Sequence, residues 1–139
     1  MIIIVCVDDN MGMSFNHRRQ SQDRILREKI LKLINGNRLW VSPYSARQFT
    51  MEQQPYLMVD EDYLNKAAVG EYCFVEHGNL SDYENDIEQI ILCRWNRIYP
   101  ADCYFEISLD EETWNGRLLE EFQGSSHEKI TLEVFLRKT

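Results

Sequence analysis

The chain has 139 residues, of which 44% are hydrophobic and 27% charged, and its formal net charge is −8. This length and composition predict one globular domain, residues 1–139, with a core large enough to fold without disulfides. The acidic balance argues against non-specific binding of nucleic acid but leaves a nucleic-acid partner open. The four cysteines form no Cys-x-x-Cys pair, so we expect free thiols, a reducing cytoplasmic location and no metal site.

The chain opens with a continuous apolar run, residues 1–7, that predicts a strand covered on both faces. Because this run is too short to cross a bilayer and has no basic segment before it, we expect neither a signal peptide nor a membrane anchor. Turn residues at 8–12 end the strand, and we expect a polar loop over residues 15–22. Ser21 is the expected N-cap of an amphipathic helix that ends at Gly36.

Short strands and helices alternate through the middle of the chain. Proline is tolerated in the first turn of a helix, which allows a helix to begin at the Ser-Pro pair that follows the second apolar run. The expected elements are a strand at 38–41, a helix from Ser42, an edge strand at 56–59, a helix at 60–68, a strand at 71–75, a helical turn or loop at 81–86 and a strand at 87–95.

The last third of the chain reads as strands joined by turns. Apolar and polar side chains alternate over residues 103–109, as in a strand with one wet face. Trp114 and Phe122 belong to a late strand, and residues 130–136 form the final one. Early strands that alternate with helices, followed by late hairpins, predict an α/β fold: a three-layer domain with a mixed central sheet and antiparallel C-terminal strands.

This order of elements resembles dihydrofolate reductase. That family opens with an apolar strand, a mobile loop with glycine turns, and a helix with an acidic residue in its first turn. Residues 7–13 are similar to the loop, and Asp23 takes the place of the acid. Residues 89–96 and the Ser126-His127 pair before the last strand are similar to the family's final strands. The resemblance implies that family's three-layer fold and, as one candidate function, an NADPH-dependent reductase.

Departures from the family pattern argue against that activity. The chain is shorter between Phe49 and Tyr56, where the family builds part of its NADPH site. The Gly-Arg-x-Thr start of a phosphate-binding helix is here Ser-Pro-Tyr-Ser at residues 42–45, without the arginine and with one N–H fewer. The second phosphate turn, residues 76–79, brings a carboxylate, that of Glu76. We therefore expect an altered or non-catalytic reductase-like domain whose cofactor, if any, is unknown.

The resemblance also brings the loop at residues 124–127 close to the loop at residues 11–20, beside the start of a helix. Arginines, hydroxyls and free N–H groups at such a place suit a phosphate or another anion. We expect a nucleotide or another phosphate-containing small molecule as the ligand. The candidate ligand-binding residues are His17, Arg18, Arg19, Arg24, Ser125 and Ser126. Asp23 and His127 are the candidate catalytic residues, because together they suit acid–base chemistry.

Other interpretations of the same residues stay open. Arg18 and Arg19 are equally consistent with ion pairs to Asp8, Asp9 or Glu128 that only hold the loop in place. The domain is also compatible with binding a protein partner, or a second copy through its late antiparallel edge. A final alternative is a small bacterial-type nuclease or phosphoesterase of the ribonuclease Z kind. That family uses a His-x-His-x-Asp-His run, which three scattered histidines do not supply.

Overall fold

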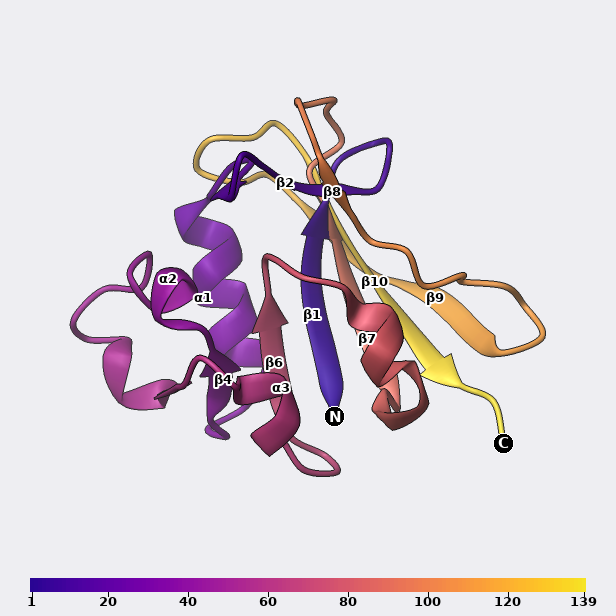
Figure 1. The fold of residues 1–139 in the computed structure, drawn as a ribbon. Helices are drawn as coiled ribbons and strands as arrows, with labels where there is room; N and C mark the ends of the chain where they lie inside the picture. Colours follow the sequence, from indigo (N-terminus) through magenta and orange to yellow (C-terminus); the bar gives the residue numbers. More distant parts are fainter.

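The computed structural model describes the whole chain, residues 1–139. Its main feature is a seven-stranded sheet with the order β5-β4-β6-β1-β7-β10-β9, accompanied by a small sheet with the order β3-β2-β8 (Figure 1). The strands are β1 (Ile2–Val7), β2 (Gly12–Phe15), β3 (Arg18–Arg19), β4 (Leu39–Val41), β5 (Leu57–Val59), β6 (Tyr72–Val75), β7 (Gln89–Arg94), β8 (Cys103–Tyr104), β9 (Trp114–Phe122) and β10 (Ile130–Arg137). The helices are α1 (Arg24–Leu33), α2 (Pro43–Ala46) and α3 (Tyr63–Lys66), with 3₁₀ segments η1 (Gln54–Tyr56) and η2 (Leu80–Asp86).

The first strand lies in the middle of the large sheet. It pairs in parallel with β6 on one side and β7 on the other, and β4 continues the parallel half between β6 and β5. On the opposite side, β10 pairs antiparallel with both β7 and β9. The predicted α/β class, mixed sheet and antiparallel C-terminal strands are therefore confirmed.

Both faces of the large sheet are covered around β1, which explains the unbroken apolar run at the start of the chain. Ile4 belongs to the apolar cluster under α1, together with Leu26 and Ile30 one helical turn apart. Ile3 and Val5 point to the other face, where α3, η2 and the segment before β9 supply the covering side chains. A strand whose successive residues all meet a covered face needs apolar side chains at every position. No helix is long and apolar enough to span a membrane.

The segment at residues 15–22 differs from the expected loop. β2 and β3 form a hairpin in which Ser14 pairs with Arg19 and Phe15 with Arg18. Its two turn residues, Asn16 and His17, have φ values of 51° and 60°. Two consecutive left-handed residues are typical of the tight turn whose twist matches that of a hairpin. A hydrogen-bonded hairpin therefore replaces part of the polar loop that the sequence predicted.

Two other element boundaries also differ from the sequence predictions. Helix α1 begins at Arg24, and Asp23 rather than Ser21 is its N-cap. The predicted strand at residues 103–109 is regular only at β8, because Phe105 and Ile107 turn inward and pack on the second face of the large sheet. Their apolar–polar alternation reflects burial on one side without strand pairing.

Candidate functional site

Polar side chains gather where the parallel strands β1, β6 and β7 have their carboxyl ends. In α/β sheets this edge is the usual place for a ligand site. The loop after β9 lies there beside the first turn of α1, so residues about 100 positions apart in the sequence meet (Figure 1). Two hydrogen-bond networks occupy this edge, one centred on Asp23 and the other on Glu76.

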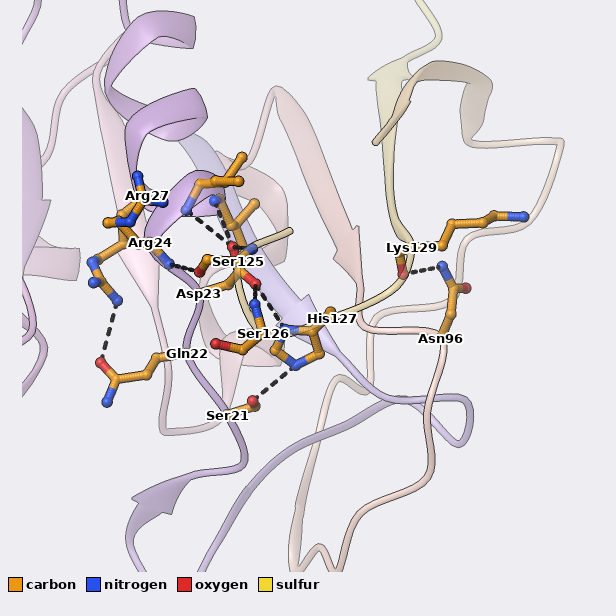
Figure 2. Close-up of polar contacts among 12 residues, drawn as sticks. Ser21, Gln22, Asp23, Arg24, Arg27, Asn96, Ser125, Ser126, His127 and Lys129 are labelled. Carbon is orange, nitrogen blue, oxygen red and sulfur yellow. Dashed lines mark hydrogen bonds and ion pairs between the residues drawn. The ribbon is translucent and has the colours of Figure 1, made fainter. Parts of the chain in front are cut away.

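The Asp23 carboxylate is buried and accepts five hydrogen bonds (Figure 2). Oδ1 accepts from the N–H groups of Ile25 and Leu26 at 3.0 and 3.1 Å, and from that of Ser125 at 3.0 Å. Oδ2 accepts from the N–H of Ser126 at 2.8 Å and from Nδ1 of His127 at 2.9 Å. Asp23 thereby caps α1 and fastens the β9–β10 loop to it.

These contacts determine the charge of Asp23. Burial by itself would raise the pKa of this carboxyl. The hydrogen bond from His127 and the N–H groups of Ser126, Ser125 and Leu26 outweigh burial and hold the pKa of Asp23 well below its usual range. Asp23 is therefore an anion at neutral pH, and the partial positive charge at the helix N-terminus faces it.

His127 is held on all sides by this arrangement. Its ring stacks on Trp95, with centroids 4.4 Å apart and planes 23° apart. An ionised carboxylate only accepts hydrogen bonds, so Nδ1 carries the proton that binds Asp23. In the neutral ring, Nε2 is then an acceptor, and it lies 2.9 Å from the hydroxyl of Ser21 and 3.2 Å from that of Tyr99. The result is a line of groups running from Asp23 through His127 to Ser21.

The second network surrounds the carboxylate of Glu76, directly after β6. Arg19 binds it with two donors, Nε at 2.8 Å and Nη2 at 3.1 Å, and its guanidinium lies 4.4 Å from the ring centroid of Tyr44. The hydroxyl of Ser45 and the amide of Gln48 donate to the same carboxylate at 2.8 and 2.9 Å. The charge of Arg19 is thus balanced by Glu76.

A small pocket lies between the two networks. The volume open to the centre of a water molecule is about 10 Å³, which suits a single water. Its lining includes Ser21, Arg27, Gln48, Glu76 and Trp95. The apolar part of the lining comes from Cys6, Leu26, Ile30 and Phe74. The pocket therefore combines an apolar base with hydroxyl, amide and charged groups.

Arg27 is the cation of this pocket that no carboxylate binds. Its Nη1 donates to the amide oxygen of Gln22 at 3.2 Å, while its buried Nε has no partner. Burial lowers the pKa of Arg27. The positive charges of Arg19 and Arg24 lower it further, while the negative charge of Asp23 raises it. Arg27 therefore has an unused donor directed away from solvent.

The structure brings together only part of the predicted site. Asp23, Ser125, Ser126 and His127 form one cluster, and the Ser125 hydroxyl accepts from the N–H of Arg24 at 3.0 Å. The N–H groups that we expected to hold a phosphate are bonded to Asp23 instead.

The other predicted residues lie outside this cluster. His17 and Arg18 are exposed at the hairpin turn, and the guanidinium of Arg24 binds Glu28 at 3.1 Å on the outer surface of α1. Arg19 pairs with Glu76, a partner that the sequence analysis did not consider for it.

Sequence reasoning missed Ser21, Arg27 and Tyr99 as members of the site, and it gave Glu76 and Trp95 no role in it. The positions of Glu76 and Trp95 could have identified them as site residues, because each directly follows a buried strand. The Ser-x-Asp spacing could have identified Ser21, because it places the side chains of Ser21 and Asp23 just before a helix.

The site contains no group of three or more His, Cys, Asp or Glu side chains arranged to hold a metal ion, nor does the rest of the chain. Most polar groups of the site are instead bonded to one another or to the backbone, with Nε of Arg27 as an exception. No model of a known protein family matches this chain, and no curated protein matches it.

Proposed function

We propose that this protein is an altered dihydrofolate reductase-like domain that binds a small anionic ligand, such as a carboxylate or a phosphate ester, through Arg27. The mixed sheet, its antiparallel C-terminal strands and the acidic residue at the start of α1 support the resemblance. The unpartnered Nε of Arg27, buried at the pocket, is the observation on which the choice of ligand depends.

An anion beside Arg27 would relieve a cost that the free protein bears. Arg27 is only partly buried, but its Nε lies away from solvent, and a buried N–H without an acceptor costs about 1–3 kcal/mol. Carboxylates and phosphates accept two parallel hydrogen bonds from arginine, which uses Nε and one terminal nitrogen together. Gln22 is exposed and occupies Nη1, so it is the group that such a ligand would displace.

The residues near the expected phosphate turns do not fit NADPH. Helix α2 has only four residues, and the Ser42 hydroxyl already caps it by accepting from the N–H of Ser45 at 3.1 Å. The buried carboxylate of Glu76 lies beside α2 and accepts from Ser45. A phosphate placed there would meet this carboxylate at close range, and the repulsion would oppose binding.

The experiment is thermal unfolding with titrated inorganic phosphate, acetate, nucleotides, NADPH and dihydrofolate. A ligand at 100 times its Kd adds about 2.7 kcal/mol, which corresponds to a rise of roughly 8 °C in Tm for a chain of this size. Arg27→Ala should abolish the rise produced by anions, and Arg27→Lys should weaken it.

The matched control is Lys32→Ala, which removes one positive charge from an exposed position on the same helix. It should keep the ligand response, and the general stabilisation that phosphate gives most proteins should appear in every variant. A rise with NADPH that survives Arg27→Ala would contradict the proposal and favour a reductase. No rise with any anion beyond that general stabilisation would also contradict it and favour a protein partner.

A further inference from the structure

We propose that Ser21 is a nucleophile activated by His127, and that the site transfers or hydrolyses the acyl group of a small ester or thioester. The inference concerns the same pocket as the proposed function, but it depends on His127 and not on Arg27. What carries it is the continuous line of contacts from a buried carboxylate through an imidazole to a hydroxyl at the pocket (Figure 2).

The geometry meets the requirements for an activated serine. The nucleophile and the base must lie within hydrogen-bond reach, and a third group must orient the base. Ser21 Oγ lies 2.9 Å from Nε2 of His127, and Nδ1 of the same ring lies 2.9 Å from Asp23. Asp23 is fixed by four backbone N–H groups, so the ring cannot turn without breaking a network that also caps α1.

Asp23 acts as a positioning residue. The anionic carboxylate keeps the proton on Nδ1, which leaves Nε2 free to accept the proton of Ser21, and it would stabilise the imidazolium that forms. The hydroxyl of Tyr99 also lies near Nε2, at 3.2 Å, but the hydroxyl of Ser21 is closer, at 2.9 Å. Trp95 supports the face of the ring. Imidazole and hydroxyl are therefore prepared for proton transfer before a substrate arrives.

The pocket limits the size of the acyl group. Its open volume of about 10 Å³ accommodates about one water molecule, which is also the size of a methyl group, so the pocket favours an acyl group with a short chain, such as acetyl, over longer ones. The backbone N–H of Gln22, directly after Ser21, has no acceptor within the protein. An N–H next to the nucleophile is a suitable donor to the oxyanion that forms during acyl transfer.

The reaction balances without a cofactor. Ser21 Oγ attacks the carbonyl carbon of the ester and forms a C–O bond while its proton passes to Nε2 of His127. The bond from carbon to the leaving oxygen or sulfur breaks, and His127 returns the proton to the leaving group. Water then attacks the carbonyl carbon of the acyl-serine and gives a proton to Nε2 of His127. The bond from this carbon to Ser21 Oγ breaks, His127 returns the proton to Oγ, and a carboxylic acid is released.

The test combines a covalent probe with a chromogenic ester. Treatment with a fluorophosphonate should add one probe mass to Ser21, since its oxygen displaces fluoride at phosphorus and His127 takes the proton. p-Nitrophenyl acetate should release about one equivalent of nitrophenolate in a burst. Ser21→Ala should lose both signals, while Ser108→Ala, which removes an exposed hydroxyl far along the chain, should keep them.

The Asp23→Asn variant distinguishes a role of Asp23 in positioning His127 from a role in folding alone. It should slow labelling by roughly 10²–10⁴-fold, the range for loss of general base assistance. The midpoint of its pH–rate profile should also move to lower pH, a change that mere loosening of the loop would not produce.

Absence of probe at Ser21 in the wild-type protein would overturn the inference, as would ester hydrolysis equal in wild type and Ser21→Ala. Thermal shifts with anions test the proposed function, and labelling of Ser21 tests this inference, so failure of one is distinguishable from failure of the other.

Discussion

Asp23→Asn is the substitution whose effect on stability can be worked out most fully from the structure. Asparagine is as good an N-cap as aspartate, so the bonds from Ile25 and Leu26 to one side-chain oxygen should remain. The other oxygen becomes an NH₂ group that faces two donors, the N–H of Ser126 and Nδ1 of His127. The substitution therefore changes one half of the network and leaves the other intact.

The expected cost follows from those two contacts. An unsatisfied N–H costs about 1–3 kcal/mol, and a lost hydrogen bond to a charged group about 1.5–3 kcal/mol. Part of this free-energy cost is recovered when the proton of His127 moves to Nε2, because Nδ1 can then accept a hydrogen bond from the new NH₂ group. We expect a net loss of about 3 kcal/mol at pH 7, within the stability of a typical domain, so the variant should fold.

Urea unfolding at pH 7 measures this loss as a midpoint lowered by roughly 1–2 M at an unchanged slope. The pH dependence has a defined sign. Because the pKa of Asp23 is depressed in the folded state, its contribution is complete above the unfolded value of about 3.9 and disappears as the pH falls toward the folded value. The difference between wild type and Asp23→Asn should therefore shrink below about pH 4.

Asp9→Asn provides the matched control, because Asp9 is exposed in the loop after β1. It should change stability by no more than about 0.5 kcal/mol. A loss under 1 kcal/mol for Asp23→Asn at pH 7, or a loss that stays the same from pH 7 to pH 3, would refute the reasoning.

Three further predictions follow from the same structure. Glu76→Gln weakens the paired hydrogen bonds from Arg19 and leaves the charge of Arg19 unbalanced, so urea unfolding should show a free energy of unfolding lower by about 2–3 kcal/mol. An unchanged midpoint would contradict the pairing of Arg19 with Glu76. Gly124→Ala places a Cβ in steric conflict with the Asp23 carboxylate, so thermal unfolding should show a loss of about 1–3 kcal/mol, and a neutral result would mean that the loop is free to move. Burial raises the pKa of Cys73 to about 12, so this thiol should resist a disulfide reagent at pH 8 until the protein is unfolded; mass mapping of rapid labelling at Cys73 in native protein would contradict its burial.

The sequence predicted the elements whose signal is local. The apolar run at residues 1–7 predicted the central strand, since a strand between two covered faces needs apolar side chains throughout. The α/β class and the antiparallel C-terminal strands followed from the order of apolar runs and turns. The hairpin at β2 and β3 was missed, because Asn16 and His17 adopt left-handed angles that neither residue requires.

The site depended on contacts between distant residues. Ser21 and Asp23 are both good N-caps, and the choice between them was decided by Ser125 and Ser126, which lie more than 100 positions away and donate to Asp23. Arg19 had several acidic residues within reach by sequence, and its partner proved to be Glu76, 57 positions along the chain.

The sequence by itself therefore determined the alternation of apolar elements, and with it the class of fold. Only the tertiary structure decided how the polar groups of the site pair. A buried carboxylate takes the donors nearest to it in space, and those donors come from loops that the sheet brings together.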